Sequence, residues 1–127
     1  MKSDITSRKD IHRIVFTFYE RLIKDKDMYP FFEDFIVNKT LEHHINIITS
    51  FWEDILFNTQ NYTNNVLQKH LTSHQKNTFK KIHFDTWLTY FIETINNHFK
   101  GLNAELMKNR AQSIAIVMQI KMKNPPD

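Results

Sequence analysis

The sequence lacks cysteine and long apolar runs. Without cysteine among its 127 residues, disulfide bonds, thiolate catalysis, cysteine-rich zinc sites and C-x-x-C-H attachment of a cofactor are excluded. The longest uninterrupted apolar run is Ile114–Met118, far shorter than the roughly 20 residues that cross a bilayer. The polar N-terminus, MKSDITSRKD, has no apolar signal-peptide core. We therefore expect a soluble, cytoplasmic protein that does not associate with membranes.

Glycine and proline are also scarce, with one Gly and three Pro in the whole sequence. So few turn-forming residues leave little room for tight hairpins, and apolar residues recur every three or four positions, which indicates an all-α fold. The length suits one compact domain. We expect a single domain over 1–127 with a core of about 7–122, and with frayed ends at 1–6 and 123–127.

The sequence has no strong charge of either sign. Seventeen Lys and Arg against fourteen Asp and Glu give a formal net charge of +3. The cations are scattered; Lys69, Lys76, Lys80 and Lys81 could form a basic surface, but lysines in a polar segment commonly solvate a loop, and no recognition helix accompanies them. We expect no nucleic-acid partner.

The first half of the chain predicts three helices. Ser7 and Asp10 have the spacing of a capping box and place the start of the first helix near Ser7. Pro30 suits the first turn of a short helix over 30–37, PFFEDFIV. Asn38 or Thr40 then caps a longer helix that runs to about Phe57.

The second half predicts two more long helices after a polar segment. One carries Phe84 and Trp87 on its inward face and ends at Gly101 as a C-terminal cap. Asn103 caps the last helix, with Leu102 and Met107 as a hydrophobic staple. The inward positions of this helix are Met107, Arg110, Ala111, Ile114, Val117 and Met118.

Aromatic residues are abundant, with eleven Phe, four Tyr and two Trp. Such a surface can enclose a large flat ligand, although aromatic cores also occur without one. Tyr19 lies on the apolar stripe of the first helix, and His44 lies on that of the helix before Phe57, whereas His43 lies on its flank. A buried tyrosine hydroxyl needs either a carbonyl acceptor or a bound ligand.

His70 shares a helical face with Val66, Leu67 and Leu71. A histidine in this setting is commonly a core residue that is hydrogen-bonded to a carbonyl. The alternative is an axial ligand that projects into an apolar cavity, which suits a haem iron. His74 follows four residues later, so the pair could bind zinc, but the sequence shows no further ligands at suitable spacing.

Four fragments of the chain resemble the truncated haemoglobins, specifically their third group. These fragments are FYERLIKDKDMYPFF at 18–32, EHHINIITSFW at 42–52, LQKHL at 67–71 and HFDTWLTYF at 83–91. Their order, spacing and inward faces match the family from about Ile11 to Met118. The resemblance implies a two-over-two helical sandwich around non-covalent haem b.

The resemblance also implies roles for individual residues. It makes His70 the proximal iron ligand and Tyr19, His44 and Trp87 the polar distal residues. It places Phe32 against the haem edge, and Ile48, Phe51, Trp52, Val66 and Phe84 along the pocket walls.

The implied function is binding of O2 and other diatomic ligands, such as NO and CO, or of peroxide. Tyr19 and Trp87 would retain O2 strongly, which suits a reaction of the bound ligand. That reaction would be either NO detoxification as a dioxygenase or a peroxidase-like reaction. Both require a separate reductase. Reversible O2 storage or sensing is the alternative. If the resemblance is set aside, an all-α binding domain without haem is a further alternative.

Overall fold

The structure, a computed structural model, describes residues 2–59 and 79–123, with side chains up to residue 120 in the last helix. All regular elements in these ranges are helical, which confirms the all-α prediction. They are α1 (Arg8–Lys24), the 3-10 helix η1 (Tyr29–Phe31), α2 (Glu33–Val37), α3 (Leu41–Phe57), α5 (Lys81–His98) and α6 (Leu102–Lys123).

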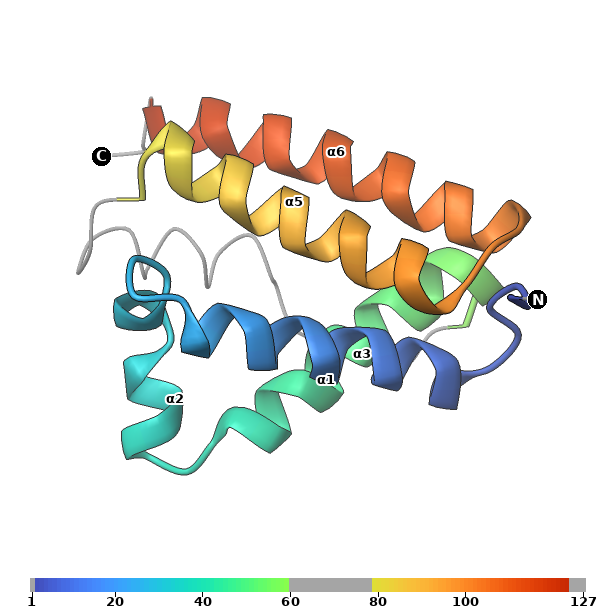
Figure 1. The fold of residues 1–127 in the computed structure, drawn as a ribbon, viewed down its shortest axis with the longest axis horizontal. Helices are drawn as coiled ribbons and strands as arrows, with labels where there is room; N and C mark the ends of the chain where they lie inside the picture. Colours follow the sequence, from blue (N-terminus) through green and yellow to red (C-terminus); the bar gives the residue numbers. More distant parts are fainter. Residues whose placement is uncertain (1, 60–78, 124–127) are drawn as a thin grey trace.

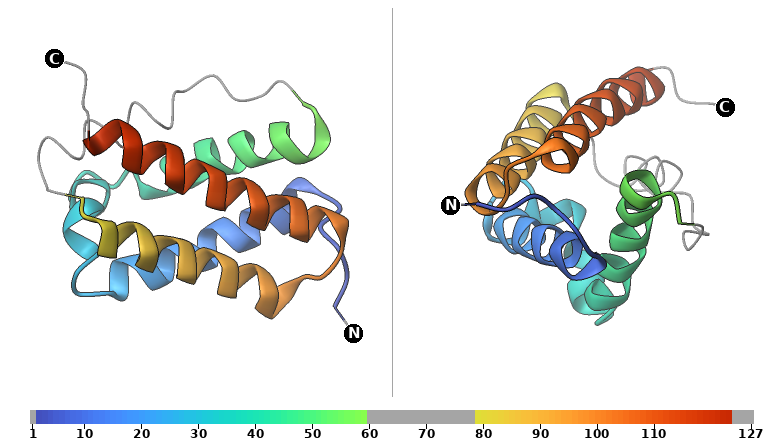
Figure 2. Two further views of the ribbon diagram at one scale, coloured as in Figure 1. Left: turned by 90° about the horizontal axis from the view of Figure 1, so that it is seen from above. Right: turned by 90° about the vertical axis from the view of Figure 1, so that its right-hand side faces the viewer.

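The four long helices form two pairs that pack on one another. α1 packs against α3, and the antiparallel helices α5 and α6 form the second pair (Figure 1). α1 also packs against α5, and α3 contacts α6, so the two pairs enclose a shared core (Figure 2). The short helix α2 lies at the end of the molecule opposite the turn between α5 and α6 (Figure 1). None of the helices in the described ranges has the length and apolar character of a membrane span.

α1 begins at the residue that its sequence predicted, but the capping box is only half formed. Ser7 is the N-cap, and its side chain accepts a hydrogen bond from the backbone N–H of Asp10. The Asp10 carboxylate does not return to Ser7; it accepts from the N–H and the hydroxyl of Thr6 at 2.9 and 3.1 Å. The Ser7 and Asp10 side chains therefore still accept hydrogen bonds from backbone N–H groups at the start of α1.

The short helix predicted over 30–37 is divided in two. Pro30 lies within η1, and α2 starts only at Glu33. Between them the backbone N–H of Phe32 bonds to the Tyr29 carbonyl, which closes the tighter 3-10 turn. This break turns Phe32 into the core, where its side chain is 4 % exposed. The longer helix, α3, ends at Phe57 as predicted, with Asn58 as a left-handed C-cap.

The start of α6 differs from its prediction because a distant carboxylate caps it. Asp4 accepts hydrogen bonds from the backbone N–H groups of Asn103 and Ala104 at 2.9 and 3.0 Å. Asn103 therefore lies inside the first turn, and its side chain donates to the Ile5 carbonyl. The predicted staple is also wrong, since Leu102 is 86 % exposed while Met107 is fully buried.

Within the segment predicted to be frayed, residues 3–5 make specific contacts near the turn between α5 and α6. Ile5 has no exposed surface, and the Ser3 carbonyl accepts a hydrogen bond from the N–H of Lys100. Gly101 does not end α5, which stops at His98, but it permits this packing. Its φ of +147° suits glycine, and an added Cβ would lie 2.4 Å from the Asp4 side chain.

Two residues predicted to face inward from α6 are at the surface instead. Arg110 and Val117 are exposed, while Ala104, Ala111 and Ala115 are buried. Ala111 is buried as predicted, but the hydrophobic pattern gave Ala104 and Ala115 too little weight, although small side chains suit close helix packing. α6 also carries apolar residues on its exposed side, so its hydrophobic pattern does not separate the inward face from the outward face.

We expect Asp4→Ala to destabilise the fold by about 1–2 kcal/mol, the usual loss of an N-cap. Burial raises the pKa of Asp4, but hydrogen bonds from Asn103, Ala104, Ile5 and Leu102 lower it by more, so the net shift is downward from 3.8. The carboxylate therefore stabilises the fold fully above its unfolded-state pKa, and this contribution is lost as the pH falls through the lower folded-state pKa.

Urea unfolding of wild type and Asp4→Ala between pH 7 and pH 2 checks this expectation. The difference in unfolding free energy should be largest at neutral pH and shrink in acid. Asp10→Ala, which removes an exposed local cap near the same end of the chain, is the matched control. A pH-independent difference for Asp4→Ala would show that the carboxylate charge is not what caps α6.

Candidate functional site

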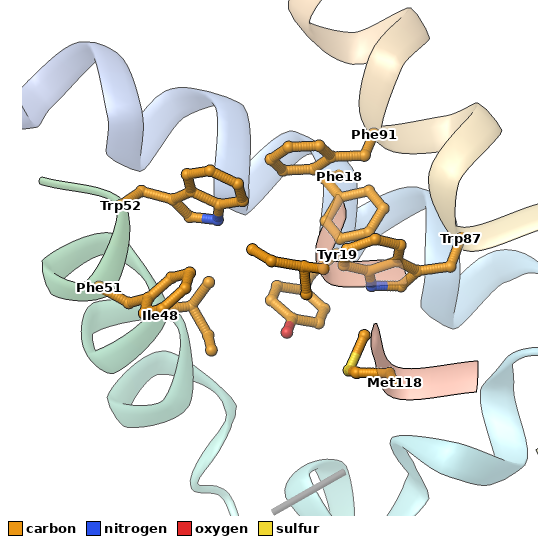
Figure 3. A pocket seen from close by; sticks show the side chains of 9 residues that line it. Phe18, Tyr19, Ile48, Phe51, Trp52, Trp87, Phe91 and Met118 are labelled. Atoms are coloured by element: carbon orange, nitrogen blue, oxygen red, sulfur yellow. The ribbon is translucent and has the colours of Figure 1, made fainter. Parts of the chain in front are cut away.

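An apolar pocket lies where the two helix pairs meet. Its lining comes from α1, α3, α5 and α6, whose side chains converge in Figure 3. The lining residues are Phe18, Tyr19, Ile48, Phe51, Trp52, Trp87, Phe91, Ile114 and Met118. Aromatic and aliphatic groups make up nearly all of this wall, so the few polar hydrogens in it act in a low-dielectric environment.

Tyr19 brings a hydroxyl into the pocket. Its side chain is 2 % exposed, and its hydroxyl oxygen lies 2.9 Å from Nε2 of His44. Burial raises the pKa of Tyr19 well above its ordinary value of 10, because the apolar surroundings disfavour the phenolate. Tyr19 therefore keeps its proton at neutral pH and can donate a hydrogen bond.

His44 is held between two aromatic rings. It is 4 % exposed, whereas the adjacent His43 is at the surface, as the helical pattern predicted. The Tyr19 ring meets the imidazole edge-on, with centroids 5.3 Å apart and an interplanar angle of 65°. Phe35 of α2 stacks on the imidazole at 4.2 Å with an interplanar angle of 21°. These contacts orient the side chain toward Tyr19.

Trp87, like Trp52, contributes an indole N–H to the wall. Its ring is 7 % exposed, stacks on Phe91 at 5.8 Å and meets Phe18 edge-on at 5.7 Å. The indole and the Tyr19 phenol project into the same group of lining side chains (Figure 3). An indole N–H only donates hydrogen bonds, so Trp87 favours an acceptor in the pocket.

The structure brings together most of the wall residues that the sequence proposed. Ile48, Phe51 and Trp52 line the pocket, and Phe32 packs edge-on against Tyr19 at 5.4 Å. Phe84 is buried beside Phe79 at 4.5 Å and is not among the lining residues. Val66 and His70, together with His74, fall outside the residues that the structure describes.

Sequence reasoning missed several residues of the site. Phe18, Phe91, Ile114 and Met118 line the pocket, although their periodicity marked them only as core positions. Phe35 belongs to the short helix predicted over 30–37, but nothing in the pattern pairs it with His44. That pairing joins two different helices, α2 and α3, and sequence spacing within one helix does not encode it.

The donor set limits what the pocket can hold. Residues 2–59 and 79–123 contain no group of three or more His, Asp or Glu that could bind a metal ion between them. The wall instead offers broad apolar surfaces and three polar hydrogens, from the Tyr19 hydroxyl and the indoles of Trp52 and Trp87. The chemistry of this lining matches the face of a large flat apolar cofactor with a small polar ligand bound beside it.

Comparisons with known proteins agree with this arrangement. No protein-family model matches the chain. The group 3 truncated hemoglobin ctb of Campylobacter jejuni is 31% identical over 117 residues, which cover 91% of this chain and 90% of that protein. The crystal structure of a group III truncated hemoglobin from Campylobacter jejuni superimposes with a TM-score of 0.84, at 29% identity over 96% of this chain and 95% of that one.

Proposed function

The chain belongs to the group III truncated haemoglobins, a family of haem globins that bind small gaseous ligands, and on that basis we propose His70 as the iron ligand of non-covalent haem b. The sequence has no cysteine that could attach the cofactor. The apolar walls on α1, α3 and α5 suit the faces of a macrocycle. Val66 would add to the wall on the His70 side.

When bound, haem would supply reversible binding of diatomic gases, and an O2 ligand held there would carry partial negative charge. Tyr19 and Trp87 would then donate hydrogen bonds to the partly negative ligand. Because the pocket is apolar and Tyr19 stays protonated, these bonds are stronger than they would be in water. His44 would act through its contact with the Tyr19 hydroxyl.

The proposed activity is redox chemistry on a retained ligand, with NO detoxification as the leading reaction and a peroxidase-like reaction as the related one. The observation that carries this proposal is the buried Tyr19 hydroxyl, 2.9 Å from His44 in an apolar wall. Donors that hold a charged ligand slow its release, which favours reaction over delivery. In the NO reaction, O2 and NO combine with one electron to give nitrate, so a separate reductase must return that electron.

Rapid mixing of the O2-loaded protein with NO tests the activity. We expect about one nitrate per haem within the mixing time, followed by further turnover only when a chemical reductant is added. Trp87→Phe should yield less nitrate at low O2, because it loses O2 faster. Release of O2 without nitrate would contradict the proposal and leave reversible storage or sensing as the function.

A further inference from the structure

The Phe35 ring lies closer to the His44 imidazole than the Tyr19 ring does. It lies 4.2 Å from the imidazole and nearly parallel to it, at 21°. Phe35 comes from α2, a five-residue helix, and is half-buried. It is not among the residues that line the pocket, so a role in the site must act through His44.

The orientation of the imidazole plane determines where His44 can form a hydrogen bond. An imidazole N–H lies in the plane of its ring, so Nε2 meets the Tyr19 oxygen at 2.9 Å only when that plane is suitably turned. The torsion that turns the ring has broad, roughly two-fold preferences, and the side chain alone does not fix it. A parallel ring at van der Waals distance restricts this rotation.

The direction of the hydrogen bond matters as much as its length. When the Tyr19 hydroxyl donates to His44, its hydrogen is not available to a ligand in the pocket. When Nε2–H of His44 donates to the Tyr19 oxygen, the hydroxyl hydrogen stays free to turn toward the ligand. Both arrangements fit the 2.9 Å separation, but only the second lets Tyr19 stabilise a negatively charged ligand.

We propose that Phe35 is a positioning residue, which holds the plane of the His44 imidazole so that Nε2 stays within hydrogen-bond distance of the Tyr19 oxygen, the arrangement in which Nε2–H can donate and the Tyr19 hydrogen can turn to the ligand. This inference rests on the proposed function of Tyr19 as a donor. It assigns no ligand contact to Phe35 and explains why a half-buried aromatic residue of α2 stacks on a histidine of the site.

The test compares Phe35→Leu and Phe35→Met with wild type. Both variants keep an apolar side chain but remove the flat ring. We expect O2 dissociation to accelerate roughly three- to tenfold, less than complete loss of the Tyr19 bond would give, with CO dissociation changed less than about twofold. Phe35→Tyr keeps the ring and should restore the wild-type ratio. Phe16→Leu is the matched control, because Phe16 also stacks on a histidine, His12, but is 47 % exposed on α1.

Two further measurements separate positioning from general loosening. In a Tyr19→Phe background, Phe35→Leu should cause no additional acceleration, because the group that it orients is absent. Crystal structures of Phe35→Leu should show the imidazole in more than one orientation, with Nε2 beyond hydrogen-bond distance of the Tyr19 oxygen in at least one.

The outcomes also distinguish this inference from the proposed function. If Tyr19→Phe accelerates O2 release but Phe35→Leu and Phe35→Met do not, Phe35 has no positioning role and the proposed function stands. An equal acceleration of O2 and CO in the Phe35 variants would show a loosened wall and overturn the inference. If Tyr19→Phe itself has no effect on O2 release, both proposals fail.

Discussion

Substitution of His70 by alanine is expected to abolish stable haem binding. The chain has seven histidines, and the likeness to the group III truncated haemoglobins is what makes His70, on an apolar helical face of the sequence, the proposed axial ligand. Removal of the coordinate bond leaves only apolar contacts, which do not fix the iron in the pocket. Purified His70→Ala should therefore show no Soret band, or one that is lost on gel filtration.

Exogenous imidazole should restore haem binding to His70→Ala, because it occupies the space of the missing side chain and supplies the same nitrogen ligand. His43→Ala is the matched control, since His43 is exposed on α3, and its spectrum should match that of wild type. His74→Ala should also bind haem normally. A wild-type spectrum in His70→Ala would overturn the assignment and direct attention to His44.

The site residues on long helices could be predicted because their helical faces determine their direction. Tyr19, His44 and Trp87 each share a face with three or more buried apolar residues, and all three are buried as the pattern indicated. A period of 3.6 residues separates His44 from His43 by about 100°, which is enough to place one in the core and the other in solvent. Because these helices are long and regular, the same angle between successive residues holds along their whole length, and each side chain's direction can be predicted.

The connections and caps could not be predicted, because contacts distant in sequence decide them. Asp4 caps α6 from 99 residues away, whereas capping patterns in a sequence relate residues only three or four positions apart. The break at Phe32 likewise accompanies a contact distant in sequence, that of its ring with Tyr19. The stacking of Phe35 on His44 joins α2 to α3, and sequence spacing gave no sign of it.

The donor variants Tyr19→Phe and Trp87→Phe are expected to have the second large effect. Each removes one polar hydrogen and keeps an aromatic ring in the wall of the pocket. A hydrogen bond to a charged acceptor is worth on the order of 1.5–3 kcal/mol. Each substitution should therefore accelerate O2 dissociation by roughly ten- to over a hundredfold, as measured by stopped-flow displacement of O2 with CO.

Carbon monoxide provides the internal control for these variants. Its outer atom carries little charge, so loss of a hydrogen-bond donor should change its dissociation much less. A change in the wall that only opens or narrows the pocket would alter both gases together. Phe51→Leu, at a half-buried lining position without a polar hydrogen, should show that second behaviour, with similar changes for O2 and CO.

The ratio of O2 to CO dissociation rates in Tyr19→Phe, relative to wild type, tests the central claim most directly. The claim is that the buried Tyr19 hydroxyl stabilises a charged ligand. It predicts that the ratio rises by roughly tenfold or more, with nearly all of the change in the O2 rate. An unchanged ratio would contradict it and would show that the hydroxyl serves only the structural hydrogen bond to His44.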